Sequence, residues 1–212
     1  MFYRDFTDSK GNPFRITKTF EFRDGEYMFN LKVKASALSG SGINLNNDNI
    51  AYTLAWGPVL GPVSVIKNRY NVTTQGYHEA GRYRKVMGGG GGCSLRRAES
   101  RYEEISRILD WVGVANRYFF VGVVPDQKDY VYAFDQRSQD KFFFGISHPR
   151  FKDGSFEDAF RVYAGPKDRK ILRKYGNGFE SVMGGRLLKP ITVFLEWMIR
   201  VFYGFSDSYG IA

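Results

Sequence analysis

The sequence predicts a mainly β protein, an antiparallel β-sandwich that ends in a helical tail. Aromatic residues make up 17% of the 212 residues, and the segments that carry them alternate apolar with polar side chains, as half-buried antiparallel strands do. These short segments follow one another with turn-forming residues between them, which is typical of a sandwich. The length suits one sizeable core, so we expect one domain.

The first strands are expected to form a hairpin. Residues 14–22 read F-R-I-T-K-T-F-E-F, and residues 27–33 alternate in the same way. Asp24 and Gly25 stand between the two runs, and this dipeptide is a strong signal for a tight hairpin turn. Residues 36–49 are rich in Ser, Gly and Asn, so we expect a loop there.

The later strands are separated by recognisable turns. Residues 105–125 form the most apolar segment of the body of the chain and predict two buried strands that meet near Ala115 and Asn116. The sequences D-Q-R-S-Q-D and H-P-R-F-K-D-G-S are predicted turns. Further strands are expected at residues 50–56, 130–134, 141–147 and 156–163, and a short strand is expected to begin at Gly61 and Pro62.

A glycine run at residues 88–92 precedes Cys93, the only cysteine. The run lacks the Lys-Ser/Thr pair that completes a phosphate-binding loop, so we expect a flexible loop between strands that carries an ordinary thiol. The alternative is a nucleophilic Cys93 with His78 or His148 as its base. A single cysteine makes no internal disulfide and does not indicate a compartment.

Other catalytic signals are few. The histidine, serine and cysteine motifs of metalloproteases, hydrolases and paired-cysteine sites are absent from the sequence, and the carboxylates stand mostly beside Lys and Arg, as on solvated faces. We therefore expect no catalytic residue, no metal and no cofactor.

The formal net charge of +9 suits a nucleic acid or an anionic phospholipid surface. We favour the membrane because basic residues cluster just before the last apolar segment, where each adds about 1 kcal/mol of attraction to anionic lipid. No recognised nucleic-acid-binding module is present, so we expect no nucleic acid partner. The clustered residues are Lys167, Arg169, Lys170, Arg173 and Lys174.

Two helices are predicted after the last strand. Residues 163–176 read Y-A-G-P-K-D-R-K-I-L-R-K-Y-G, with Pro166 suited to the first turn of a short basic helix and Gly176 to its end. Residues 187–205 carry apolar residues at the spacing of one helix face. Thr192, Glu196 and Arg200 form the opposite polar stripe.

The second helix is long enough to span a bilayer, which needs about 20 residues, but its central charges would each cost roughly 2.5–3.5 kcal/mol there. We therefore expect it to lie in the membrane interface, or alternatively to pack on the sheet of the chain itself. The start M-F-Y-R-D-F-T-D has no signal-peptide pattern, so a membrane role would belong to a longer protein or a peripheral binder. The expected interface residues are Arg186, Leu187, Leu188, Lys189, Ile191, Phe194, Trp197, Met198, Arg200 and Phe202.

Four stretches together resemble the large periplasmic domain of the YidC/Oxa/Alb membrane-protein insertase family. They are residues 18–31, K-T-F-E-F-R-D-G-E-Y-M-F-N-L; residues 111–125, W-V-G-V-A-N-R-Y-F-F-V-G-V-V-P; residues 163–176; and the helix ending F-S-D-S-Y-G-I-A. The family motif within the third stretch comprises Tyr163, Gly165, Pro166, Lys167, Tyr175 and Gly176.

The resemblance implies a twisted sandwich of the galactose-mutarotase-like supersandwich type, shortened at its start. It implies an inner-membrane protein with this domain on the periplasmic side, without enzymatic activity, that contacts the Sec translocon and its accessory subunits. Through the full-length protein it would act on nascent membrane proteins as an insertase and chaperone. Residues 1–165 would form the sandwich, and residues 166–212 the C-terminal helices of the same domain, leading toward a transmembrane core outside this chain.

The competing interpretation is a carbohydrate-binding or mutarotase-like sandwich protein. Such a protein needs a histidine and a carboxylate that converge on a sugar. The candidates are His78 with Glu79, and His148.

Overall fold

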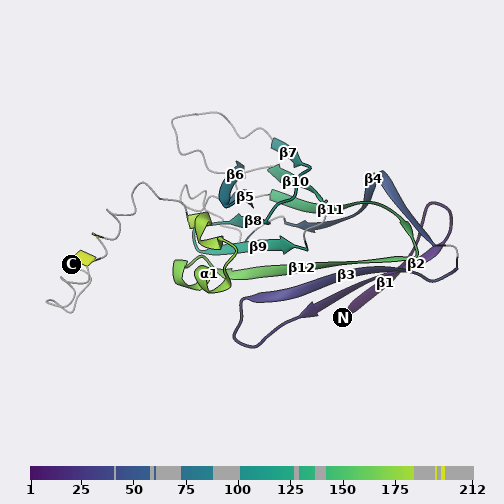
Figure 1. Ribbon diagram of the computed structural model, residues 1–212, viewed down its shortest axis with the longest axis horizontal. Helices are drawn as coiled ribbons and strands as arrows, with labels where there is room; N and C mark the ends of the chain where they lie inside the picture. The colour runs from purple at the N-terminus through teal and green to yellow at the C-terminus, as the bar shows by residue number, and fades with distance from the viewer. Residues whose placement is uncertain are drawn as a thin grey trace, which may run out of the picture. The chain divides into compact units, whose positions relative to one another are not determined.

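The computed structural model describes residues 1–40, 42–57, 60, 73–87, 101–126, 129–136, 142–183, 194 and 197–198. The chain divides into two compact units, Met1–Ser181 and Val182–Ala212. The first unit holds the strands (Figure 1). They are β1 (Phe2–Thr7), β2 (Pro13–Glu21), β3 (Met28–Ala37), β4 (Ile43–Trp56), β5 (Thr74–Glu79), β6 (Arg82–Met87), β7 (Arg101–Ile105), β8 (Trp111–Ala115), β9 (Phe119–Pro125), β10 (Val131–Gln136), β11 (Phe142–Asp153) and β12 (Ser155–Pro166), followed by helix α1 (Arg169–Tyr175) and the 3-10 helix η1 (Phe179–Met183).

The strands form two antiparallel sheets, which confirms the predicted mainly β sandwich. The large sheet has eight strands in the order β1-β2-β3-β12-β9-β8-β5-β6, and the small sheet has four in the order β4-β11-β10-β7. The N-terminal hairpin therefore lies on one side of β12, and the buried pair β8 and β9 lies on the other (Figure 1).

The hydrophobic core lies between the two sheets. Alternate residues of the large sheet, such as Val33 and Val112, share one cluster with Tyr132, Phe134 and Phe144 of the small sheet. All five side chains are at most 2% exposed. The period-two pattern of the strands is what places these residues on the same inner faces.

The predicted hairpin and the predicted buried strand pair are confirmed. β2 and β3 pair so that Phe20 stands opposite Leu31, and Gly25 in the turn has a positive φ of 69°, which favours glycine. β8 and β9 are connected by the three residues that follow Ala115.

The expected loop at residues 36–49 is wrong. β3 continues to Ala37, and β4 already begins at Ile43. The first half of β4 is rich in Asn because β4 is an edge strand of the small sheet, where one side is not paired with another strand. Asp48 and Asn49 adopt positive φ angles of 51° and 66° and interrupt the strand's regular pattern.

The expected turn H-P-R-F-K-D-G-S is also wrong for most of its length. β11 runs through it to Asp153, with shifts in its register to β4 on either side of Pro149. Proline is tolerated at such irregular positions because they lack a regular ladder hydrogen bond. Further differences are β1, β5, β6 and β7, which the sequence did not lead us to expect. The glycine run, Cys93 and the start of the strand expected at Gly61 and Pro62 lie outside the described residues.

Candidate functional site

The family motif forms a corner at the end of β12. Tyr163 is fully buried and packs its ring against Phe120, Tyr175 and Phe179 at centroid distances of 5.8, 5.2 and 5.7 Å. Its hydroxyl donates a hydrogen bond to the carbonyl oxygen of Pro166 at 2.7 Å. Burial raises the pKa of this hydroxyl, so it stays a proton donor.

Gly165 and Lys167 belong to the same corner. A Cβ atom at Gly165 would lie 2.8 Å from the ring of Tyr27, so only glycine allows Tyr27 to lie this close. Lys167 donates from Nζ to the carbonyl oxygen of Asn116 at 3.0 Å. Burial, with a smaller effect of the positive charge of Lys85, lowers the pKa of Lys167.

The basic helix is shorter than predicted. Pro166 is the last residue of β12 and pairs with Phe119, so it does not stand in the first turn of α1. Asp168 caps the helix instead, because its carboxylate accepts the backbone N–H groups of Lys170 and Ile171 at 2.8 and 3.0 Å. The predicted end at Gly176 is confirmed, with a φ of 68°.

Helix α1 is tied to the turn between β2 and β3. Glu26 of that turn accepts hydrogen bonds from Lys174 at 2.8 Å and from the Tyr175 hydroxyl at 2.5 Å. These bonds, with Lys174 contributing most, lower the pKa of Glu26. The Tyr175 hydroxyl also accepts the N–H of Tyr27 at 2.9 Å, so the motif links α1 to the turn between β2 and β3.

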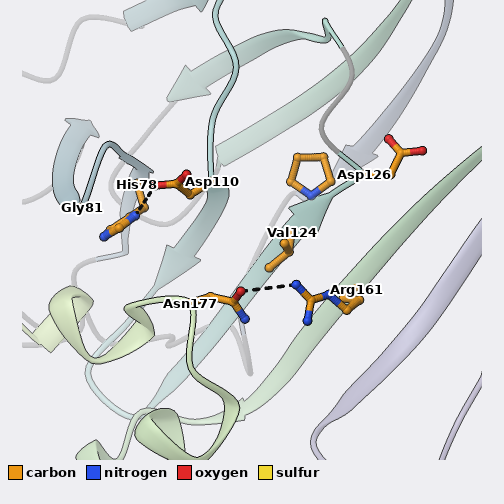
Figure 2. A pocket seen from close by; sticks show the side chains of 8 residues that line it. His78, Gly81, Asp110, Val124, Asp126, Arg161 and Asn177 are labelled. Carbon is orange, nitrogen blue, oxygen red and sulfur yellow. Dashed lines mark hydrogen bonds and ion pairs between the residues drawn. The ribbon is translucent and has the colours of Figure 1, made fainter.

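Beside this corner the large sheet carries a cleft of about 550 Å³ on the face turned away from the small sheet. Figure 2 shows His78 and Asp110 on one side of it, Asn177 and Arg161 on another, and Val124 between them. The remaining lining residues are Gly81, Pro125 and Asp126.

His78 is held tightly in the wall of the cleft. Its Nδ1 lies 2.8 Å from Oδ2 of Asp110, and its ring stacks on Trp111 at 5.4 Å. A Cβ atom at Gly178 would lie 2.9 Å from its Nε2. The side chain of His78 is only 9% exposed, whereas that of Asp110 is 47% exposed, so Asp110 is the member of the pair that faces solvent.

The opposite wall offers a cation and an amide. Arg161 donates to Oδ1 of Asn177 at 3.3 Å, while the Asn177 carbonyl accepts from the indole N–H of Trp111 at 2.8 Å. Asp126 is already engaged, since it accepts from the Tyr130 hydroxyl at 2.6 Å and from the N–H of Ala159 at 3.2 Å. The cleft therefore suits a small polar ligand, and the described residues that line it include no hydroxyl or thiol nucleophile.

The three residues named for a sugar site do not converge. Glu79 forms an ion pair with Arg107 at 3.0 Å and points to the opposite face from its neighbour His78, as successive residues of a strand do. His148 lies on the small sheet, 3.7 Å from Asp158. Asp110, Arg161 and Asn177 were not predicted, because they come from separate segments and share no local motif.

Among the residues that the structure describes, no three His, Cys, Asp or Glu side chains gather as metal ligands would. Within the same residues, no helix has both the length and the apolar character needed to cross a membrane.

Three residues of the predicted interface helix are described. Phe194, Trp197 and Met198 are helical, and Phe194 and Trp197 are 58% and 60% exposed with ring centroids 6.1 Å apart. The other predicted interface residues lie outside the described part of the chain. They are Arg186, Leu187, Leu188, Lys189, Ile191, Arg200 and Phe202.

Comparison with known proteins finds one family over almost the whole chain. Residues 4–198 match the family model of the YidC periplasmic domain. Among curated proteins, the chain is 25% identical over 235 aligned residues to the membrane protein insertase YidC of Treponema denticola, covering 100% of this chain and 38% of that protein.

Two further relatives carry the same name. The YidC of Treponema pallidum is 23% identical and covers 100% of this chain and 40% of its own length. The YidC of Endomicrobium trichonymphae is 26% identical, covering 93% of this chain and 36% of its own length. The chain thus spans about two fifths of the length of the relatives that it matches.

Proposed function

The chain belongs to the YidC periplasmic domain family, and from this premise we propose that it works as the periplasmic domain of a membrane-protein insertase. The match over residues 4–198 carries the proposal. The names of the relatives support it, since each is a membrane protein insertase. The insertase would help nascent membrane proteins to insert and fold in the inner membrane, with this domain on its periplasmic side.

The proposed role of the domain is binding and docking without enzymatic activity. Residues 1–165 would present the sandwich to partners, namely the Sec translocon and its accessory subunits. Residues 166–212 would form the C-terminal helices of the same domain and lead toward the transmembrane core. The corner at Tyr163 supports this arrangement, because its buried aromatic contacts hold α1 firmly against the large sheet.

The predicted interface helix would dock on the outer leaflet of the inner membrane. Phe194 and Trp197 support this proposal, because both are more than half exposed and aromatic side chains favour the boundary between water and lipid. Arg186, Lys189 and Arg200 would meet lipid phosphates. The double substitution Phe194→Gln and Trp197→Gln removes the two aromatic side chains.

We expect this variant to bind vesicles containing phosphatidylglycerol at least about tenfold more weakly, as loss of two interfacial aromatic side chains implies. Flotation of the whole chain with vesicles measures the effect. The pair Tyr3→Gln and Phe6→Gln, on the exposed strand β1, controls for loss of surface aromatics. Equal binding of the helix variant and the unchanged chain would remove the helix as a membrane contact.

Carbohydrate binding is a second candidate, which the cleft beside His78 favours. Its volume of about 550 Å³ accommodates a small ligand, and Asp110, Arg161 and Asn177 supply acceptors and donors for hydroxyl groups. Calorimetric titration with monosaccharides tests it. Binding at millimolar or lower concentration that Asp110→Asn weakens would support this function, and absence of binding heat would dismiss it.

A further inference from the structure

The turn between β8 and β9 carries an exposed aromatic tip, defined as Arg117, Tyr118 and Phe119. Tyr118 is 61% exposed and Phe119 is 45% exposed. The guanidinium of Arg117 lies over the Tyr118 ring at 5.4 Å from its centroid. Exposed aromatic side chains beside a cation are typical of protein surfaces that contact lipid headgroups.

The aromatic tip is fixed by hydrogen bonds. Oδ1 of Asn116 accepts the N–H groups of Tyr118 and Phe119 at 2.8 and 2.7 Å. The N–H of Lys167 donates to the carbonyl oxygen of Tyr118 at 2.7 Å, which joins the tip to the family motif. A tip that is already ordered loses little conformational entropy when it binds a surface.

Basic side chains lie next to the aromatic tip. The Nζ of Lys167 donates to the carbonyl oxygen of Asn116, the residue before the tip, at 3.0 Å. Burial lowers the pKa of Lys167, and the nearby charge of Lys85 adds to this effect. Lys170 is exposed in the first turn of α1. The carboxylate of Asp168 stands next to Lys167 in the sequence and accepts the backbone N–H groups of Lys170 and Ile171 at the start of α1.

We propose that the aromatic tip and its neighbouring lysines form a membrane contact on the folded body of the domain, separate from the interface helix. Tyr118 and Phe119 enter the headgroup layer, and Arg117 and Lys170 meet the phosphates of anionic phospholipid. The proposal rests on the proposed function only for the presence of a membrane beside the domain. Figure 1 places the end of β8 and the start of β9 at the same end of the large sheet as α1.

The shape of the surface favours lipid over nucleic acid. Proteins that bind single-stranded nucleic acid line a groove with stacking aromatic side chains. Tyr118 and Phe119 instead stand at the end of a hairpin, where Asn116 closes the turn. A protruding tip enters a headgroup layer with few other contacts.

The test is vesicle binding by the whole chain with the double substitution Arg117→Gln and Tyr118→Ser. We expect about tenfold or greater weakening with vesicles that contain phosphatidylglycerol, because one basic residue near an anionic surface contributes about fivefold and the aromatic contact is lost as well. The effect should vanish with pure phosphatidylcholine. Both residues are exposed, so the fold should tolerate the changes, and urea unfolding checks this.

A control exists on β1. Tyr3 is 62% exposed, and its neighbour Arg4 is exposed as well. The pair Arg4→Gln and Tyr3→Ser removes one positive charge and one aromatic side chain of the same kinds, and should weaken binding by less than about twofold. Equal weakening by the two pairs, or no weakening by the tip pair, would overturn the proposal.

A second readout separates the tip from the interface helix. A polarity-sensitive fluorophore is attached at position 118 in the variant Cys93→Ser, Tyr118→Cys, and its emission should shift to the blue on anionic vesicles. The label is read on vesicle-bound chains whose interface helix is unchanged. If it stays in water there, and the Phe194 and Trp197 substitutions separately abolish binding, the tip proposal fails and the proposed function stands. If the label shifts to the blue even in a chain that carries those two substitutions, the tip binds the membrane independently of the helix. Binding of the tip pair, Arg117→Gln and Tyr118→Ser, to a DNA oligonucleotide is measured as well. If these substitutions weaken oligonucleotide binding but leave vesicle binding unchanged, the tip is not a lipid contact.

Discussion

The carboxylate of Asp8 connects the turn after β1 with the start of β4. Its Oδ1 accepts the N–H groups of Lys10 and Asn12, both at 2.8 Å, and its Oδ2 accepts from the Asn12 amide and the N–H of Asn44, both at 3.1 Å. Burial alone would raise the pKa of Asp8, but these hydrogen bonds outweigh it and lower the pKa to about 2.

This pKa makes the stability of the domain depend on pH. The folded-state pKa of about 2 lies below the value of about 3.9 for an unfolded chain. The contribution is therefore present above about pH 4 and is lost as the pH falls through about 2. We expect Asp8→Asn to be less stable than the unchanged chain at neutral pH, and the difference in urea midpoint to shrink between about pH 4 and 2.

Asp24→Asn in the exposed turn between β2 and β3 controls for loss of a surface carboxylate. A difference between the Asp8→Asn variant and the unchanged chain that stays constant down to pH 2 would contradict the linkage to the Asp8 pKa.

The cleft brings together residues whose proximity could not be predicted from the sequence. His78 and Asp110 are 32 positions apart, and they meet because β5 pairs with β8 so that His78 stands opposite Trp111. Neither residue belongs to a recognisable motif. The motif residues 163–176 could be recognised from the sequence. The burial of Tyr163 and the lack of room for a side chain at Gly165 could not, because both depend on Tyr27, which is far away in the chain.

At the level of elements, a polar link joins strands of the two sheets. Tyr52 of β4 donates its hydroxyl to Oδ2 of Asp158 on β12 at 2.6 Å. Asp158 is 0% exposed, so the expectation that carboxylates lie on solvated faces is wrong for this residue. The reason is its register, because Asp158 stands opposite the buried Val33 of β3.

Removal of this hydroxyl should destabilise the sandwich. We expect Tyr52→Phe to lower the free energy of unfolding by about 1.5–3 kcal/mol, the range for hydrogen bonds to charged groups. Tyr102→Phe is the matched control, since Tyr102 donates to Glu104 at 3.0 Å but is 66% exposed, and its loss should cost less than about 0.5 kcal/mol. Equal effects in urea unfolding would show that burial of the Tyr52 bond does not matter.

The strands that were predicted correctly are those with strict alternation and a clear turn, such as β2 and β3 around Gly25. The first half of β4 was missed because Asn residues read as a loop, although an edge strand tolerates them. The end of β11 was missed because Pro149 reads as a turn, whereas the irregular register there accommodates it.

At the level of the whole first unit, an aromatic cluster fastens the C-terminal corner to the large sheet. Phe179 is fully buried and packs edge-on against Trp111 at 5.4 Å and Phe120 at 5.3 Å. The sandwich class could be predicted from composition and alternation. This cluster could not, because its members come from β8, β9 and the segment after α1.

Phe179→Ala should therefore destabilise the first unit by about 3–5 kcal/mol, as truncation of a buried aromatic side chain does. Urea unfolding measures the loss, and hydrogen exchange should show faster exchange of the α1 amides. Phe22→Ala, at a residue that is 70% exposed, should cost less than about 0.5 kcal/mol. Unchanged exchange in α1 would mean that its tie to Glu26 suffices to hold the helix.

The strand order of the large sheet has a consequence for the time course of folding. β2 and β3 are neighbours in sequence and can pair as soon as both have been synthesised, but β3 meets the rest of its sheet through β12. Residues Leu31 and Phe160, which stand opposite each other, are separated by more than a hundred positions. The first hairpin must therefore wait for nearly the whole unit to emerge before it docks, which predicts slow folding and a period in which its apolar face needs protection.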